Sequence, residues 1–202
     1  MKRLLTPIVW TFLGIQICCG LCEHALDAAE LPMITTLKPL YPETALVRDG
    51  EPTCVIVSPE GSGYAQLAER LREAIHTATG ALVAAKSANN MVDANGTIDL
   101  AATRSMNLIT LGNVNNNRLL ATLYGERYVV ADSIYPGTGG HVIRTVHDPF
   151  AMGVNVLALA GSDLNGVAKA MSVFTESYLK DGGPDLVLGT PIVDVEFEKR
   201  GY

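Results

Sequence analysis

Short apolar runs that lead directly into long amphipathic helices constrain the fold of this chain most strongly. The apolar run 54–58 lies between two prolines, as is typical of a buried strand. In the segment 63–80 that follows, apolar side chains recur every three or four residues, which predicts a helix packed on one face. Ser62 is predicted to cap the start of this helix and Gly80 to end it. A strand followed at once by a helix is the first half of a βαβ unit.

A second pair of the same kind lies nearer the C-terminus. The nearly continuous apolar run 154–160 predicts a strand covered on both faces, and 164–179 predicts a helix capped by Ser162 or Asp163. Further elements are predicted at 81–85, 107–111 and 141–146 as strands, the last half-exposed, and at 115–125 as a short helix. Strands that alternate with two long helices predict an α/β or α+β fold, a single mixed-sheet sandwich with both long helices packed on the sheet.

The N-terminal segment is typical of an export signal. Lys2 and Arg3 precede the almost wholly apolar segment 4–21, so we expect a secreted or periplasmic protein with no stable membrane span once the signal is removed. An uncleaved membrane anchor is the alternative. The predicted organisation is a signal peptide at 1–22, a Pro/Thr-rich lead-in at 23–53, an α/β domain at 54–184, and a C-terminal tail or edge strand at 185–202.

Composition and charge limit the partners of the chain. With 202 residues, of which 48% are hydrophobic, the chain can bury one core, so one domain is expected. A formal charge of -6 disfavours nucleic acid and anionic membrane surfaces, which need a basic face, and leaves neutral or cationic ligands open. After removal of the signal Cys54 is the one remaining cysteine, so we expect a buried thiol and no disulfide framework. No cofactor is expected.

No motif of the chain specifies a reaction. Ser133, His147 and Asp163 supply the residue types of a hydrolase triad, but no G-x-S-x-G turn surrounds the serine. On a continuous strand His141 and His147 would lie about 20 Å apart, too far to share one ion, so no metal site is predicted. The glycine-rich turn 137–140 lacks the lysine of a phosphate-binding loop and precedes a strand rather than a helix.

One group of side chains suits a sugar ligand. Planar hydrogen-bonding groups can hold sugar hydroxyls, and an aromatic ring can cover the apolar face of a sugar. The predicted ligand-binding residues are Asp132, Tyr135, Arg144, His147, Asp148 and Phe150. The alternative is structural: Arg144 and Asp148 form an ion pair, His147 and Asp148 cap a turn, and the two rings pack on the sheet.

Short signatures in a fixed order carry a resemblance to a known family. They are the strand CVIVSPE, the helix AQLAERLREAIHTATG, the strand and turn LITLGNVNNN, the strand GHVIRTV, and the closing segment NVLALAGSDLNGVAKAMSVFTE. Over 54–80 and 107–174 the sequence resembles the non-catalytic α/β domain that precedes the catalytic barrel in bacterial α-glucuronidases and β-N-acetylhexosaminidases. Ala160 departs from this pattern, which has glycine at that place.

The resemblance implies a function without assigning a reaction to any residue. In the resembled enzymes the catalytic carboxylates lie on a barrel of about 250 residues, and we expect no such barrel in a chain of 202 residues. The resemblance therefore implies a secreted, non-catalytic, carbohydrate-associated accessory domain that binds a glycan or docks a glycan-processing enzyme. The alternative is a small stand-alone secreted hydrolase or esterase that uses Ser133 or His147.

Overall fold

Two β-sheets and three α-helices make up the described part of the chain. The computed structural model describes residues 42–92, 97–99, 101, 106–179 and 182–198, so the predicted signal peptide and most of the lead-in lie outside the described residues. The helices are α1 (Ser62–Thr79), α2 (Arg118–Gly125) and α3 (Leu164–Tyr178), with a 3-10 helix, η1 (Ala88–Met91). The strands are β1 (Thr44–Arg48), β2 (Glu51–Pro52), β3 (Cys54–Ser58), β4 (Ala84–Ser87), β5 (Asn107–Gly112), β6 (His141–Val146), β7 (Val156–Gly161), β8 (Leu186–Leu188) and β9 (Val193–Glu196).

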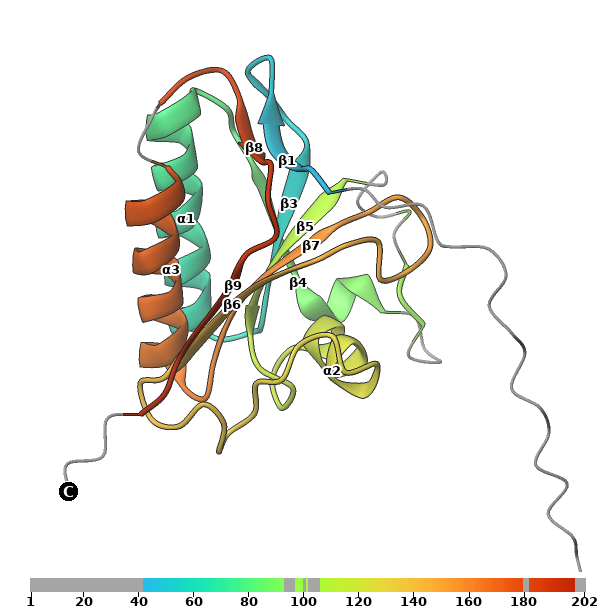
Figure 1. Cartoon of the computed structure of the whole chain (residues 1–202), viewed down its shortest axis with the longest axis vertical. Helices are drawn as coiled ribbons and strands as arrows, with labels where there is room; N and C mark the ends of the chain where they lie inside the picture. The colour runs from blue at the N-terminus through green and yellow to red at the C-terminus, as the bar shows by residue number, and fades with distance from the viewer. Residues whose placement is uncertain (1–41, 93–96, 100, 102–105, 180–181, 199–202) are drawn as a thin grey trace, which may run out of the picture. The chain divides into compact units, whose positions relative to one another are not determined.

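The larger sheet has six strands in the order β4-β3-β5-β7-β6-β9. β3 pairs in parallel with β4 and β5, and β5 pairs in parallel with β7, whereas β6 runs antiparallel to both β7 and β9. α1 and α3 cover one face of this sheet and α2 lies on the other (Figure 1). The predicted α/β class is confirmed, with a mixed sheet and both long helices packed on it.

The hydrophobic core lies in two layers, one on each face of the larger sheet. On one face α1 and α3 bury apolar side chains of their predicted stripes, which include Leu71, Ile75 and Phe174, whereas Leu164 and Tyr178 at the two ends of α3 are exposed. On the other face the short helix α2 buries Leu119 and Leu123 against the same strands. Every residue of β3 and β7 is buried, because both strands are central and covered on both faces. This explains the continuous apolar runs of their sequences.

The helix ends follow the predicted signals with one exception. Asp163 caps α3 as expected, since its side chain accepts a hydrogen bond from Gly166 N–H at 2.7 Å. Gly80 ends α1 in the left-handed conformation, with φ of 79°. Ser62 is not the cap of α1: the helix begins at Ser62, Gly61 occupies the N-cap position, and no side chain caps this end.

Part of the segment assigned to the lead-in belongs to the folded structure. β1 pairs antiparallel with β2 and with β8, which forms a small sheet with the order β2-β1-β8. Leu46 and Val47 are fully buried in this region. The prolines that exclude a helix here do not exclude an edge strand, and Pro52 lies in the two-residue strand β2. The tail contributes β8 to this sheet and β9 to the edge of the larger one.

Two strands differ from their predicted form. β4 begins three residues later than expected, and Ala81 and Val83, which precede it, are buried outside the strand. β6 is not half-exposed: five of its six residues are buried, and Arg144 alone is partly exposed. The cause is cover on both sides, since Ile143 packs in the layer with α1 and α3 while Val142 packs in the layer with α2.

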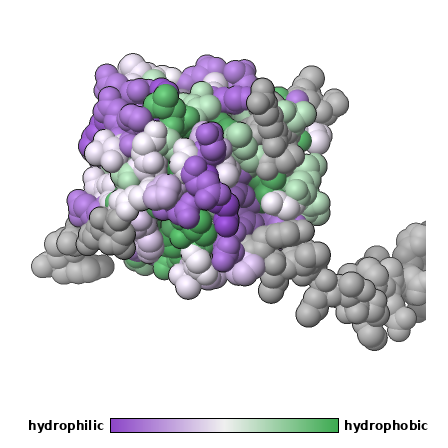
Figure 2. Space-filling view, turned by 90° about the horizontal axis from the view of Figure 1, so that it is seen from above, coloured by the Kyte–Doolittle hydropathy of each residue, from purple (hydrophilic) through white to green (hydrophobic). Residues whose placement is uncertain are grey.

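The surface at the amino ends of the parallel strands mixes polar and apolar residues. Figure 2 shows the molecule from above, where hydrophobic residues form separate patches between hydrophilic ones. Within the described ranges of the chain, no helix is both long and apolar enough to cross a membrane.

Candidate functional site

The parallel strands define two edges of the larger sheet, and the segment before β6 lies at the carboxyl edge. β3, β4, β5 and β7 all end at this edge, which is the lower one in Figure 1. Val114 N–H, just after β5, donates to the carbonyl of Ala131 at 3.0 Å. Gly137 N–H donates to Ser162 Oγ, just after β7, at 2.9 Å. These bonds fix the segment 131–140, and with it two of the predicted ligand-binding residues, at the carboxyl edge.

β6 carries the chain to the opposite, amino edge. There Leu108 N–H, in β5, donates to Asn155 O at 2.9 Å, and Asn155 N–H donates to Asn107 Oδ1 at 2.8 Å. A six-residue strand spans about 20 Å, so the segment 147–155 lies far from the segment before β6. Three of the predicted ligand-binding residues are in this second segment: His147, Asp148 and Phe150. The structure therefore does not bring the six predicted residues together.

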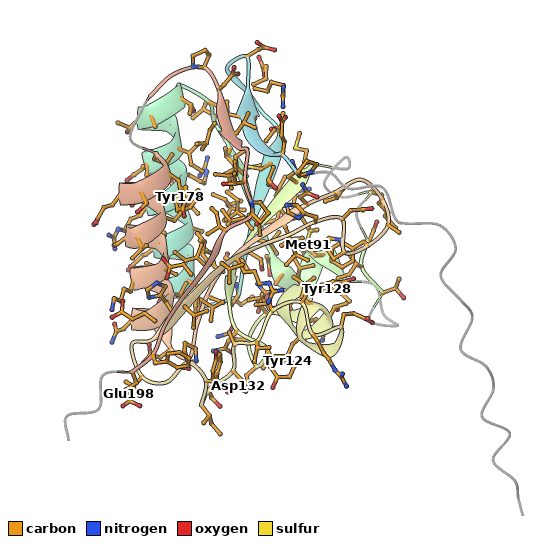
Figure 3. The ribbon with its side chains drawn as sticks, viewed as in Figure 1. Met91, Tyr124, Tyr128, Asp132, Tyr178 and Glu198 are labelled. Carbon is orange, nitrogen blue, oxygen red and sulfur yellow. The ribbon has the colours of Figure 1, made fainter. Side chains whose placement is uncertain are left out.

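Asp132 organises the loop in which it lies. Its Oδ1 accepts hydrogen bonds from Ile134 N–H at 2.7 Å and Tyr135 N–H at 2.8 Å, and its Oδ2 accepts from Tyr124 Oη at 3.2 Å (Figure 3). The donated amides, that of Tyr135 first, hold the pKa of Asp132 below its usual range. A carboxylate with these partners closes a turn, so Asp132 has a structural role here.

Tyr135 and Arg144 are the two predicted residues that share a hollow. The hollow measures about 120 Å³ and lies where β6 and β9 face away from α1 and α3. Its remaining lining is aliphatic: Val130, Val142, Val193 and Val195. The ring of Tyr135 meets that of Phe197 edge to face, with centroids 5.4 Å apart. Valine walls and small volume make this hollow, which we name the β6–β9 hollow, a poor site for a polyhydroxyl ligand.

Asp148 caps a turn, as in the structural alternative. Its side chain is buried, and Oδ1 accepts hydrogen bonds from Met152 N–H and Gly153 N–H, both at 2.7 Å. Its own N–H donates to Asn155 Oδ1 at 2.9 Å. The residue has a positive φ of 42°, a conformation that aspartate tolerates in tight turns. Phe150 packs on the hydrophobic layer beside α2.

The residue types of a hydrolase triad are not assembled. Ser133 is exposed in the loop at the carboxyl edge, whereas His147 follows β6 at the amino edge. Asp163 uses its two oxygens on backbone groups, accepting from Gly166 N–H at 2.7 Å and from Gly139 N–H at 3.1 Å. Nucleophile and base must lie within hydrogen-bond reach, so this set does not form a catalytic centre.

His141 is a buried imidazole between charged groups. Its Nε2 lies 3.6 Å from Asp194 Oδ1 and its Nδ1 lies 3.9 Å from Glu196 Oε2, and neither ring nitrogen has a hydrogen-bond partner among the described residues. Burial lowers the pKa of His141 and outweighs the two carboxylates, which raise it, while Lys169 lowers it further. The carboxylates approach different ring nitrogens, so these three side chains do not share one metal position. The described residues contain no group of three or more metal-ligating side chains.

A hollow with mixed polar and apolar lining lies at the carboxyl edge, beside edge strand β4. This α1–β4 cleft has a volume of about 380 Å³ and opens between the ends of β3 and β4 and the first turns of α1. Small side chains leave the space: Ala65, Ala68 and Ala85. Polar side chains surround it: Ser58, Glu60, Glu69, Lys86 and Ser87.

The polar groups of the cleft are held in place by short-range partners. Ser87 Oγ donates to Glu60 Oε1 at 3.5 Å, which joins the end of β4 to the loop after β3. Glu69 pairs with Arg72 one turn further along α1, at 2.6 Å. Arg72 is itself anchored because its Nε donates to the carbonyl of Val83 at 2.8 Å. The rim of the cleft therefore carries hydrogen-bond donors and acceptors, among them negatively charged carboxylates and a positively charged guanidinium.

No residue of this cleft was predicted to bind a ligand, although the sequence contains one signal for the region. Ligands of α/β sheets bind outside the carboxyl ends of parallel strands, and Ser58 and Ser87 end two adjacent parallel strands. The pairing of β3 with β4 and the space left by the alanines are properties of the fold. No local sequence motif indicates either of them.

The centre of the same edge is filled by asparagines. Asn113 Nδ2 donates to the carbonyls of Gly161 and Ser162, both at 3.1 Å, which ties the end of β5 to the end of β7. Asn116 Oδ1 accepts from Asn113 N–H at 2.8 Å, and its Nδ2 donates to Tyr64 Oη at 2.8 Å. The side chains that make these bonds fill the space between the loops after β3, β5 and β7. The open cleft consequently lies to one side, next to β4.

Comparison with known proteins identifies no matching family model and no similar curated protein.

Proposed function

We propose that this chain is a secreted, non-catalytic, carbohydrate-associated domain that binds a short glycan in the α1–β4 cleft. The single observation that carries the proposal is a cleft of about 380 Å³ at the carboxyl ends of two parallel strands, with an alanine-rich floor and polar side chains among its lining. Small-molecule sites are typically concave and about 300 to 1,000 Å³ in volume. α/β sheets bind ligands outside the carboxyl ends of their strands, which is the edge at which this cleft opens. The family resemblance and the basic-apolar N-terminus support the carbohydrate association and the secretion.

The chemistry of the lining favours a neutral or cationic sugar. Each sugar hydroxyl is both donor and acceptor, and Ser58, Ser87 and Lys86 can donate while Glu60 and Glu69 accept. The lining has two carboxylates, Glu60 and Glu69, and one ammonium, Lys86, while Arg72 beside it pairs with Glu69. The whole chain has a formal charge of -6. An acidic sugar would meet repulsion in this cleft.

A second hollow lies further along α1, which suits a ligand of more than one sugar ring. Glu69 also lines this second hollow, of about 220 Å³, which reaches His76 and the exposed Leu82. A chain of sugars lying along α1 would contact both hollows. We therefore propose an oligosaccharide in preference to a monosaccharide.

The lining supports binding and not hydrolysis. A glycosidase needs a carboxylic acid kept protonated by an apolar environment, beside a second carboxylate. Glu60 and Glu69 are both exposed, the first accepting from Ser87 and the second paired with Arg72. The hydrolase alternative has Ser133 and His147 at opposite edges of the sheet, so no observation favours it.

The test compares glycan binding by the wild-type protein with binding by a variant in which a tryptophan side chain fills the cleft. Ala85 lines the cleft and Ala84, its neighbour in β4, is equally solvent-exposed but does not line it. We expect wild-type protein and Ala84→Trp to bind the same neutral or amino oligosaccharides on a glycan panel, and Ala85→Trp to bind them at least about tenfold more weakly. Titration calorimetry of the best ligand gives the ratio.

Three outcomes would reject the proposal. They are no binding to any glycan by the wild-type protein, equal weakening by both tryptophan variants, and release of sugar from the panel by the purified chain. The last outcome would reject the non-catalytic assignment even if the cleft were the binding site.

A further inference from the structure

Among the described residues, the outer strand β9 has backbone groups on one side that no other strand pairs with, at the edge of the larger sheet. Thr145 N–H donates to Ile192 O at 3.0 Å and Glu198 N–H donates to Pro136 O at 3.1 Å. Backbone direction alternates along a strand, so Asp194 and Glu196, in register with Ile143 and His141, also direct their groups toward β6. Among the described residues β9 pairs with β6 alone.

The backbone groups that face away from β6 belong to residues with exposed apolar side chains. By the same alternation these residues are Val193, Val195 and Phe197. Their exposed fractions are 69%, 36% and 57%. They lie on one face of the strand, beside the β6–β9 hollow lined by Tyr135 and Arg144.

The other face of β9 is acidic. Asp194 is 43% exposed at its side chain and faces the buried His141, while Glu196 is 34% exposed and pairs with Lys169 of α3. Native proteins protect an edge strand by keeping it short or by charged side chains, prolines, bulges or a covering element. β9 has four residues and carries two carboxylates, so a partner strand must bring the opposite charge. The segment 193–197 contains no lysine or proline, and the pairing register of β9 with β6 is regular.

The charge pattern decides between the possible strand partners. A second copy paired edge to edge through β9 would place two sets of Asp194 and Glu196 next to each other on one face of the joined sheet. Like charges on directly opposed strands are destabilising, whereas opposite charges stabilise the pair. A partner strand with basic residues on that face, and apolar residues beside Val193 and Val195, satisfies both faces.

We infer that β9 is a docking edge that accepts an extended segment of a partner protein as a seventh strand. The segment alternates apolar and basic residues, so its backbone pairs with that of Val193, Val195 and Phe197 and its basic side chains lie beside Asp194. This mode of recognition takes affinity from main-chain hydrogen bonds and specificity from alternate side chains. The docking edge is at the opposite side of the sheet from the α1–β4 cleft, so it is independent of glycan binding.

The probes are two blocked, fluorescently labelled peptides that differ only in charge, TKVKVKT and TEVEVET. By fluorescence anisotropy we expect the lysine peptide to bind wild-type protein at least about tenfold more tightly than the glutamate peptide. The Asp194→Lys variant is expected to reduce or reverse this preference. Glu126→Lys, which makes the same change of charge at an exposed residue just after α2, is the matched control and leaves the ratio unchanged.

A proline variant distinguishes binding by strand pairing from nonspecific binding. Val195→Pro removes an N–H that faces away from β6 and leaves the β6 pairing groups in place, so we expect it to abolish peptide binding while the circular dichroism spectrum is retained. Phe197→Pro is the second variant for the case in which Val195→Pro fails to fold. Equal binding of both peptides, binding that survives a folded proline variant, or no binding of either peptide would overturn the inference. A wild-type dimer in sedimentation that the proline variant dissociates would overturn it in favour of a second copy.

Discussion

The two faces of the six-stranded sheet are covered very differently. On one face α1 and α3 provide 18 and 15 helical residues, and on the other α2 provides 8. The long helices cover their face up to β9, while the valines of β6 and β9 beside α2 line an open hollow. Helices with a continuous apolar stripe derive most of their stability from such packing. The difference indicates that packing under α1 and α3 contributes most of the stability of the fold and that packing under α2 contributes less.

The first prediction concerns the well-covered face and has the largest expected effect. Phe174, a residue of α3, is fully buried, and its ring stacks on that of Tyr178 with centroids 5.6 Å apart. We expect Phe174→Ala to lower the free energy of unfolding by about 3 to 5 kcal/mol, because it leaves a cavity in the core. Urea denaturation gives the value. A loss below 1 kcal/mol would remove the basis for assigning the stability of the fold to this face.

The second prediction concerns the thinly covered face. Asn117 Oδ1 accepts from Leu119 N–H at 2.9 Å, and its Nδ2 donates to Thr110 Oγ1 at 2.9 Å and Leu111 O at 2.7 Å. Asn117→Ala removes the cap of α2 and leaves buried groups unpaired, so we expect a loss of about 2 to 3 kcal/mol.

Hydrogen exchange locates the effect of that substitution. We expect protection to fall chiefly in α2, with α1 and α3 keeping most of theirs, because the two faces have separate hydrophobic layers. If protection fell equally in all three helices, the two layers would be one cooperative unit and the comparison between the faces would not hold.

The third prediction is a pH dependence that depends on His141. Its pKa is lowered in the folded state, so the unfolded chain binds more protons and stability falls as pH drops below the ordinary histidine value of about 6.5. The stabilising contribution is fully present above that value. Asp194 and Glu196 oppose this effect and Lys169 adds to it.

A histidine substitution isolates this effect. Melting temperatures measured between pH 7.5 and 5 should fall with pH for wild-type protein and fall less for His141→Gln. This window lies above the titration of Asp132, whose pKa is lowered from 3.8. Identical slopes for the two proteins would show that His141 is not the titrating group.

The fourth prediction has the smallest effect on stability and concerns the exposed end of the α2 face. Phe197 is 57% exposed, so Phe197→Ser should change the free energy of unfolding by less than about 0.5 kcal/mol. The edge-to-face contact with Tyr135 is lost in this variant. A larger loss in the same denaturation assay would mean that Phe197 packs as part of the core.

The sequence predicted the central elements because their signals are local. The runs at 54–58 and 154–160 are apolar throughout since both faces of β3 and β7 are covered, and the helices that follow show their buried stripe. β1 was missed because prolines on either side obscured a short strand whose partner, β8, lies 140 residues away in the sequence. Such pairing leaves no local pattern.

The candidate site was less predictable for a geometric reason. Asp132 and His147 are 15 positions apart in the sequence, and the strand between them separates them by about 20 Å. Because these residues are near one another in the sequence, they were predicted to form a cluster. The strand β6 runs from one edge of the sheet to the other and keeps them apart. The α1–β4 cleft arises instead from two segments brought together by parallel pairing, where small residues in α1 and β4 leave a space.

Cys54, at the start of β3, makes the centre of the sheet chemically observable. The thiol is fully buried, and burial raises its pKa to about 12, so almost none of it is the reactive thiolate near neutral pH. From residue 42 onward it is the only cysteine in the sequence. In a protein that begins at residue 42, the rate at which a thiol reagent modifies Cys54 therefore reports how often β3 opens to solvent. Cys54 can thus be used to measure the unfolding of the central sheet.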